Sequence, residues 1–291
     1  RSVGEREPAD GPTRHRKKAG TPTMGGVMIL TVFVASFLIA GRLDNRLAWL
    51  AVGAILSFGA LGFADDLLKL RRQKGFSIPV KFFAQFALAA VVVATLAAVA
   101  PAHFAEVFLP FVTEPVFTIG AFMVPVATLL LVGSVNAVNL SDGLDGLAAG
   151  LVALVAATFT LLAYSAGNFK IASYLLIPFI PGAGELAVVG AAMVGACLGF
   201  LWFNAHPAEV FMGDTGSLAL GAGLGVIALA VKKEALLAIA GGVLEDPLWS
   251  LPAGCPDPAA PIRSFFSDRM VALLKEKDGG LSTFANLRGG I

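Results

Sequence analysis

The chain has 291 residues, of which 57% are hydrophobic and 14% are charged, against about a quarter charged in ordinary soluble domains. Its mean hydropathy is +0.81, and no Lys or Arg occurs from residue 82 to residue 169. These values exclude a disordered chain, a collagen-like chain and a disulfide scaffold, and they argue against a soluble globular enzyme. We therefore predict an all-α, polytopic transmembrane helical bundle in a lipid bilayer. The net charge of +1 indicates no partner, and no nucleic-acid ligand is predicted.

The apolar runs, taken in chain order, give the predicted spans, because a helix of about 20 residues crosses the hydrocarbon of a bilayer. Seven runs approach this length: 24–41, 47–64, 82–102, 117–135, 146–166, 186–203 and 217–231. An eighth begins near residue 235 and weakens at Glu245, so seven or eight spans are expected. The predicted organisation is a polar N-terminal segment (1–23), a transmembrane domain (24–244) and an atypical polar tail (245–291).

The connections between these spans alternate between two sides of the membrane. One side holds 11 Lys and Arg residues, on segments 1–23, 65–81, 136–145 and 204–216. The other side holds 5, on segments 42–46, 103–116, 167–185 and 232–234. The positive-inside rule makes the first side cytoplasmic. Four polar segments are therefore predicted to meet at one cytoplasmic site, and 167–185 is predicted to be an ordered external loop or hairpin.

Two polar clusters flank the first two spans. Lys17 and Lys18 precede the first span, where they serve either as a membrane anchor or as a phosphate clamp. Asp65 and Asp66 end the second apolar run, and the i,i+4 spacing lets Asp65 face Lys69 on a helix. Carboxylates at the mouth of a membrane bundle are costly unless they bind cations or take part in chemistry. The alternative is a solvated helix end with an ion pair.

A third cluster follows the fourth span. Asn139, Asp142 and Asp145 are spaced by three and would form one polar stripe on a helix. Gly143 and Gly146 would allow a ligand to approach the backbone closely. The functional interpretation is favoured, and the alternative is that Asp142 caps the N-terminus of the next helix.

The fourth cluster, residues 204–217, is the richest in polar groups. Asp214 stands between two glycines, which suits a carboxylate that must reach a metal or a phosphate, although it could also cap the next helix. His206 precedes a proline and is interpreted as a hydrogen-bonding or exposed residue rather than a base. Phe211 is either a lipid-interface anchor or a stacking platform for a base.

The chemistry of these clusters points to phosphoryl transfer. Aspartates that can bind a hard divalent cation, together with lysines, suit reactions at a diphosphate. A bundle that opens to lipid suits a second, apolar substrate. No Walker A, GxGxxG, HExxH or GxSxG motif occurs, which removes ATPases, dinucleotide enzymes, zincins and serine hydrolases of those types.

Four segments, in the same order and spacing, resemble a known family. They are Lys-Lys-Ala-Gly-Thr-Pro-Thr-Met-Gly-Gly (17–26), Asp-Asp-Leu-Leu-Lys (65–69), Asn-Ala-Val-Asn-Leu-Ser-Asp-Gly-Leu-Asp-Gly-Leu (136–147), and Phe-Asn followed by Pro-Ala-Glu-Val-Phe-Met-Gly-Asp-Thr-Gly-Ser-Leu (203–218). The chain resembles the MraY-type phospho-N-acetylmuramoyl-pentapeptide transferases, a branch of the polyprenyl-phosphate hexose-1-phosphate transferases. The resemblance covers about residues 11 to 242.

The resemblance implies a reaction and its partners. Family members transfer phospho-N-acetylmuramoyl-pentapeptide from its UDP conjugate to undecaprenyl phosphate, which gives lipid I and UMP for peptidoglycan synthesis. They require Mg²⁺. The implied location is the bacterial inner (cytoplasmic) membrane, crossed several times, with the active site on the cytoplasmic side. A homodimer is a candidate assembly.

The resemblance also implies roles for single residues. Asp65 would act as base or nucleophile with the lipid phosphate, supported by Asp66, and Asp214 would hold Mg²⁺ as a third catalytic residue. Lys69 and Lys81 would contact phosphates near the metal. The nucleotide pocket would be shaped by Lys18, Thr23, Asn139, Asp142, Asp145, Asn204 and Phe211, with Gly143 and Leu144 beside the uracil and Phe211 stacked on it.

The chain also departs from the pattern that the resemblance implies. The family has ten spans, so a first span is expected before residue 1. A ninth span, a loop with three histidines and a tenth span are expected after Gly242, but residues 245–291 are polar and the only histidines are His15, His103 and His206. We therefore expect an intact nucleotide pocket but little or no turnover from this chain alone.

Three other functions stay open from the sequence. The first is transfer of another sugar phosphate from a UDP-sugar to a polyprenyl phosphate. The second is an inactive membrane remnant of the family. The third is a transporter or channel. The carboxylates lie at loop ends rather than in mid-span, which argues against this third function.

Overall fold

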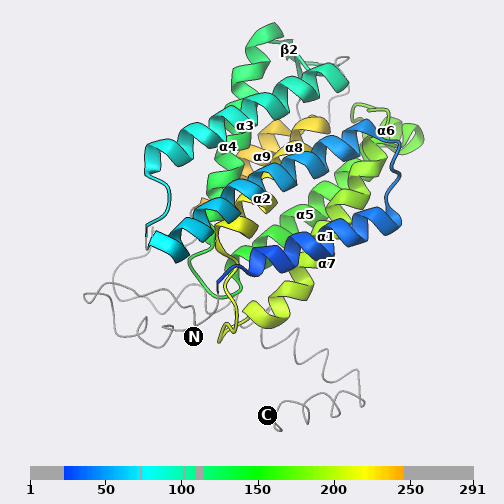
Figure 1. Ribbon diagram of the computed structural model, residues 1–291. Helices are drawn as coiled ribbons and strands as arrows, with labels where there is room; N and C mark the ends of the chain where they lie inside the picture. The colour runs from blue at the N-terminus through cyan, green and yellow to red at the C-terminus, as the bar shows by residue number, and fades with distance from the viewer. Residues whose placement is uncertain (1–22, 73, 101–102, 109–114, 246–291) are drawn as a thin grey trace, which may run out of the picture.

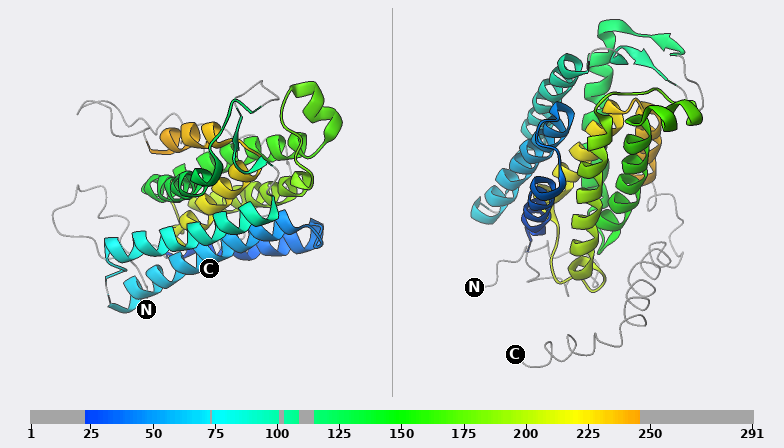
Figure 2. Two further views of the ribbon diagram at one scale, coloured as in Figure 1. Left: turned by 90° about the horizontal axis from the view of Figure 1, so that it is seen from above. Right: turned by 90° about the vertical axis from the view of Figure 1, so that its right-hand side faces the viewer.

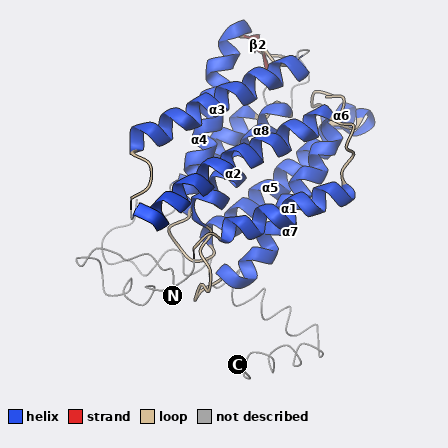
Figure 3. Ribbon diagram, in the orientation of Figure 1, coloured by secondary structure: helices blue, strands red, loops and turns tan. Residues whose placement is uncertain are grey.

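The computed structural model describes residues 23–72, 74–100, 103–108 and 115–245. Most of this part is helical, as Figure 3 shows. Six helical segments are long and apolar enough to cross a membrane: Arg46–Arg72, Ile78–Val99, Gly120–Ser141, Leu147–Ala166, Ala183–Asn204 and Gly213–Ala230. The predicted all-α, polytopic bundle is therefore confirmed, and the chain is a multi-pass membrane protein. The predictions for residues 1–22 and 246–291 lie outside the described residues.

The elements follow one another along the chain as labelled in Figure 1. The main helices of the bundle are α1 (Gly25–Ala40), α2 (Arg46–Arg72), α3 (Ile78–Val99), α4 (Met123–Ser141), α5 (Leu147–Ala166), α7 (Leu186–Asn204), α8 (Gly213–Ala230) and α9 (Glu234–Glu245). The short elements are β1 (Glu106–Val107), β2 (Phe117–Thr118), η3 (Gly120–Phe122), α6 (Phe169–Leu175) and η4 (Ala183–Glu185).

Two of the predicted spans form helices that are shorter than a span. α1 has 16 residues and α9 has 12, which correspond to about 24 and 18 Å of helix. The hydrocarbon layer is about 30 Å thick. The apolar runs predicted seven firm spans. In the described part of the chain, only six helical segments are long enough to cross the membrane, because α1 is shorter than its apolar run predicted.

Two helices extend well beyond their apolar runs. α2 continues past Asp65 and Asp66 to Arg72, and α4 continues past residue 135 to Ser141. Charged residues end an apolar run but do not by themselves end a helix. The Lys and Arg residues in the last turn of α2 stabilise this extension, because positive charges interact favourably with the negative C-terminal end of the helix dipole. The predicted connections 65–81 and 136–145 are therefore largely the ends of helices.

α8 is the central helix of the bundle. Every residue from Asp214 to Ala230 is buried, and α8 contacts α1, α2, α4, α5, α7 and α9. Small residues permit this packing: a Cβ atom on Gly221 would lie only 2.6 Å from the Cα atom of Val135 in α4. Figure 2 shows α8 in yellow, enclosed by the other helices. Its N-terminus therefore lies at the centre of one end of the bundle.

The helices alternate in direction, as the apolar runs predicted. One end of the bundle, which we call the Asp214 end, holds the starts of α1, α3, α5 and α8 and the ends of α2, α4 and α7. The other end, which we call the Asn45 end, holds the turn before α2 and the hairpin in which β1 pairs antiparallel with β2. Segment 167–185, predicted to be an ordered loop or hairpin, is ordered through α6 and η4 and also lies at the Asn45 end.

Candidate active site

The site begins with two adjacent carboxylates near the end of α2. Asp65 is 2% exposed, and its Oδ1 accepts a hydrogen bond of 2.5 Å from the backbone N–H of Phe76. Its Oδ2 lies 3.2 Å from Lys69 Nζ, one helical turn away, which confirms the predicted i,i+4 pairing. Asp65 is therefore held in place by the chain that turns back from α2 into α3.

Asp214 joins this pair through two lysines. Lys69 Nζ lies 2.6 Å and Lys81 Nζ 2.7 Å from the same Asp214 oxygen, Oδ2. Lys81 Nζ also lies 3.5 Å from Asp65 Oδ2. The side chains of Asp65 and Asp214 are 3% and 12% exposed, whereas those of Lys81 and Lys69 are 19% and 37% exposed. The ammonium groups are thus the accessible part of the cluster, where an anionic ligand can reach them.

Asp66 has a different environment, because its carboxylate lies at the N-terminus of α8. It accepts hydrogen bonds from the backbone N–H groups of Asp214 (3.2 Å) and Thr215 (2.9 Å) and from the Thr215 hydroxyl (2.7 Å). The first N–H groups of a helix have no partner within the helix, and a carboxylate there interacts favourably with the helix dipole. Asp66 therefore fixes the first turn of α8, and with it the position of Asp214.

Two glycines allow α2 and α8 to come this close. A Cβ atom on Gly62 of α2 would overlap the backbone carbonyl of Asp214. Gly213 has a φ of 74°, and a Cβ atom there would lie 2.9 Å from Asp66 Oδ2. The site thus depends on the absence of side chains at both positions.

Gly62→Ala is expected to lower the free energy of unfolding by about 1–3 kcal/mol, because the new methyl group must push α8 away. The matched control is Gly53→Ala, also in α2, where a Cβ atom meets nothing within 4 Å among the described residues. Thermal unfolding of both variants in the same detergent makes the comparison. Equal stability of the two variants would mean that the α2–α8 contact is not tight.

The turn after α4 brings a further carboxylate to α8. Asp142 follows the last residue of α4 and accepts a hydrogen bond from the backbone N–H of Gly213. Burial, and secondarily the charge of Asp214, raises the pKa of Asp142 to about 8. The alternative that Asp142 caps the next helix is wrong, since Gly146 occupies that position in α5. The predicted three-residue stripe is also wrong, because α4 ends before Asp142 and only Asn139 of the three is helical.

The rest of this turn offers backbone to a ligand. Gly143 is exposed, and a Cβ atom on it would have no neighbour closer than 4.0 Å. Leu144 is half-buried beside it. This arrangement suits the predicted contact of Gly143 and Leu144 with a planar base.

Two polar residues tie this turn to the loop after α7. Asn204 is 3% exposed; its Oδ1 accepts from the Gly146 N–H (3.0 Å) and its Nδ2 donates to the Val210 carbonyl (2.9 Å). Asp145 Oδ2 lies 3.0 Å from His206 Nδ1. His206 is therefore a hydrogen-bonding residue, as interpreted from the sequence. Asn204 and Asp145 hold the walls of the site together.

The start of α1 completes the site. The N–H groups of Gly25 and Gly26 donate to the carbonyls of Phe211 and Met212 (2.8 Å each), which brings Thr23 next to the loop that carries Phe211. Asn139 accepts a hydrogen bond of 2.8 Å from the Ser217 hydroxyl in α8. The structure thus brings together the predicted site residues that it describes; Lys18 lies outside the described residues.

Thr215 is a residue that sequence reasoning did not single out. It is 1% exposed and donates from both its backbone N–H and its hydroxyl to Asp66, which is 149 positions away. The Gly-Asp-Thr-Gly segment marked the place in the sequence. The partner could not be inferred from it, because the pairing exists only when α2 and α8 pack together.

A carboxylate of the site can supply part of the coordination of a divalent cation. In the described residues, no group of three or more His, Cys, Asp or Glu side chains is arranged to hold a metal ion. Mg²⁺ is commonly bound by one or two carboxylates together with waters and substrate phosphates. Asp214 alone, as one carboxylate at the partly accessible edge of the cluster, fits such a partial site.

The fold and the site together define a multi-pass membrane protein with a carboxylate–lysine site at one end of its bundle. Residues 47–232 match the model of glycosyl transferase family 4, and the chain belongs to this family. Residues 18–30 match signature 1 of the phospho-N-acetylmuramoyl-pentapeptide-transferases.

Two curated relatives carry the name phospho-N-acetylmuramoyl-pentapeptide-transferase. The protein of Citrifermentans bemidjiense is 52% identical over 236 residues, and that of Geobacter sp. (strain M21) is 51% identical over the same length. Each alignment covers 80% of this chain and 66% of the relative. The chain thus spans just under two thirds of the length of these relatives.

Proposed function

We propose that the chain transfers phospho-N-acetylmuramoyl-pentapeptide from its UDP conjugate to undecaprenyl phosphate. The products are lipid I and UMP. The reaction breaks the phosphoanhydride bond of the UDP conjugate and forms a new one to the lipid phosphate, so that atoms and charges balance with UMP as leaving group. The names of the two relatives and the family membership support this reaction.

The observation that carries the proposal is a pair of lysines in ion-pair contact with two buried carboxylates, Asp65 and Asp214. Lys69 and Lys81 converge on one oxygen of Asp214. When a diphosphate binds, its oxygens can take the positions beside these ammonium groups, and positioned cations stabilise charge that develops on phosphoryl oxygens. Asp65, which lies within ion-pair distance of the same two lysines, would act on the lipid phosphate either as a base or as a nucleophile.

Mg²⁺ is the proposed cofactor, with Asp214 as its protein ligand. When bound, the ion would neutralise charge on the diphosphate. Asp66 would act by holding the first turn of α8, so that Asp214 faces the substrate. Asn204, Asp145 and the half-buried Phe211 would shape the pocket for the uracil, beside Gly143.

The proposal is tested with membranes that contain the chain, supplied with UDP-N-acetylmuramoyl-pentapeptide, undecaprenyl phosphate and Mg²⁺. We expect the UDP conjugate to bind, as followed by calorimetry, and we expect UMP and lipid I at a low level, at most slightly above that of membranes without the chain. Binding without lipid I would agree with the low turnover expected for this chain alone. Equal or better use of UDP-N-acetylglucosamine would favour the other sugar-phosphate transfer, and no binding of either compound would refute both.

The Asp214 end is proposed to face the cytoplasm in the bacterial inner membrane. In a background without Cys197 and Cys255, Arg71→Cys near the end of α2 should react with a membrane-impermeant thiol reagent from the cytoplasmic side only. Lys170→Cys, exposed in α6 at the Asn45 end, should react from the external side only. The reverse pattern would overturn this orientation.

A further inference from the structure

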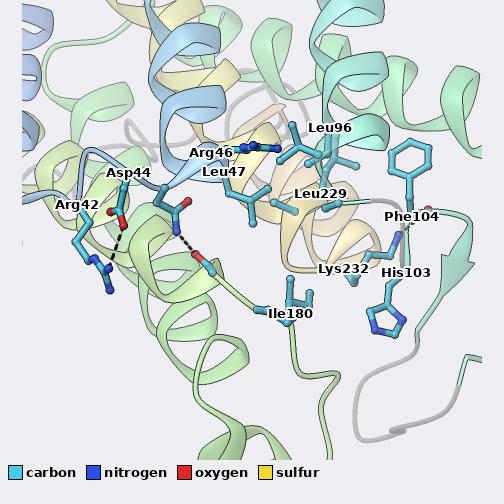
Figure 4. Close-up of a pocket in the computed structure, with 16 residues that line it drawn as sticks. Arg42, Asp44, Arg46, Leu47, Leu96, His103, Phe104, Ile180, Leu229 and Lys232 are labelled. Carbon is cyan, nitrogen blue, oxygen red and sulfur yellow. Dashed lines mark hydrogen bonds and ion pairs between the residues drawn. The ribbon is translucent and has the colours of Figure 1, made fainter.

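A cavity of about 520 Å³ opens at the Asn45 end of the bundle, away from the candidate active site. It lies between the start of α2, the end of α3, the end of α8 and the chain before η4. Figure 4 shows Leu47, Leu96, Ile180 and Leu229 on its apolar wall. The cavity therefore offers an apolar interior at an end of the bundle that is rich in charged side chains.

The charged groups around this cavity differ in how they are compensated. Arg42 pairs with Asp44 at 3.1 Å, and His103 lies 2.7 Å from Glu106. Lys232, which is 4% exposed, lies 2.5 Å from Glu234 and donates to the Phe104 carbonyl at 3.2 Å.

Arg46 is the exception among the cations that line the cavity. No carboxylate lies within ion-pair distance of its guanidinium in the part of the chain that the structure describes. Figure 4 shows its side chain extending over the cavity toward Leu96. An anion bound there would gain a charge-assisted contact that no protein group supplies.

The start of α2 strengthens the preference for an anion. Arg46 is the first residue of α2, and Asn45 caps the helix by accepting from the Ala48 N–H at 3.0 Å. The N-terminus of a helix carries a partial positive charge that adds to that of Arg46. The cavity thus combines an apolar interior with one cation at its rim, Arg46, that has no carboxylate partner among the described residues. This combination is complementary to an amphiphile with an anionic head.

Aromatic side chains place this end at the level of lipid head groups. Trp49 is 43% exposed, and Tyr164 and Tyr174 are 55% and 85% exposed, near the start of α2, the end of α5 and in α6. Exposed Trp and Tyr residues are enriched where a membrane meets water. A ligand in the cavity would therefore have its head among phospholipid head groups and its tail among acyl chains.

We propose that this cavity binds an anionic phospholipid, with the phosphate on the Arg46 guanidinium and the upper acyl chain against Leu47, Leu96 and Leu229. This site is separate from the Asp214 cluster and does not depend on the proposed transferase reaction. Its role would be to join α2, α3 and α8 at the end where the cavity separates them.

The test uses the purified chain in a neutral detergent, titrated with phosphatidylglycerol, with phosphatidylcholine or with inorganic phosphate. Binding is followed by native mass spectrometry and by thermal unfolding. We expect binding of phosphatidylglycerol at least about tenfold tighter than of phosphatidylcholine, and a loss of about tenfold in Arg46→Gln. Ala100→Trp, which fills the cavity without changing charge, should weaken binding similarly.

The matched control is Lys170→Gln, which removes one positive charge at the same end of the bundle, outside the cavity. It should bind phosphatidylglycerol as the unmodified chain does. Equal affinity for the two lipids, unchanged binding by Arg46→Gln or Ala100→Trp, or no lipid binding at all would overturn the proposal. The same stabilisation by inorganic phosphate alone would identify a soluble anion as the occupant and would equally overturn it.

Discussion

In a full-length family enzyme that carries these motifs, Asp214→Asn is expected to lower turnover by about a hundredfold to ten-thousandfold, the range found when a positioned catalytic group is lost. The carboxylate accepts from both Lys69 and Lys81 on one oxygen. A neutral amide is a poorer partner for two cations and a poorer ligand for Mg²⁺. We therefore expect release of UMP to fall and the dependence on Mg²⁺ concentration to weaken.

A second measurement makes the prediction independent of turnover. Binding of Mn²⁺, followed by electron paramagnetic resonance in the presence of the UDP conjugate, should weaken in Asp214→Asn. Glu185→Gln serves as the control, because it removes one negative charge at the Asn45 end. Normal turnover in Asp214→Asn would remove this residue from the mechanism, and unchanged Mn²⁺ binding would remove it as the metal ligand.

In the same full-length enzyme, Asp65→Asn is expected to reduce turnover by a similar factor, about a hundredfold to ten-thousandfold, for a different reason. An amide can still accept the hydrogen bond from the Phe76 N–H, so the backbone contact at 2.5 Å can persist. It can no longer act as a base or a nucleophile, and it no longer carries a charge opposite Lys69. The reaction should therefore slow while the UDP conjugate still binds.

Comparison of the two variants separates their roles. Mn²⁺ binding should stay close to that of the unmodified chain in Asp65→Asn, since Asp214 is the proposed ligand. Thermal unfolding should be recorded for both, because each replacement is made in a buried cluster. A turnover in Asp65→Asn near that of the unmodified chain would exclude the proposed role for this carboxylate.

The class of the protein and the order of its helices follow from the sequence alone. Apolar runs of membrane length occur in six of the described helices, because a bilayer requires about 20 apolar residues whatever the neighbours are. The pairing of Asp65 with Lys69 was also predictable, since an i,i+4 contact depends only on helical geometry. The side of each polar segment was predictable as well, because successive spans must cross the membrane in opposite directions.

The ends of the helices were less predictable. Hydropathy shows where polar and charged residues begin, but a helix ends where its backbone hydrogen bonds stop, and the two positions can differ. α2 continues through Asp65 and Asp66 to Arg72, beyond the end of its apolar run. The β1–β2 hairpin has only two residues per strand and left no pattern in the sequence. The stripe of three polar residues failed because α4 ends at Ser141.

The sequence by itself determined that this is an all-α membrane protein in which Asp65, Asp66, Asp142, Asp145 and Asp214 lie at the same end as Lys69 and Lys81. Only the tertiary structure decided which groups touch: that Asp66 holds the N-terminus of α8, and that Lys69 and Lys81 share one oxygen of Asp214. Those contacts join residues more than 130 positions apart. They form because Gly62 lets α8 approach α2 closely, and such a distance between helices is set by packing in three dimensions.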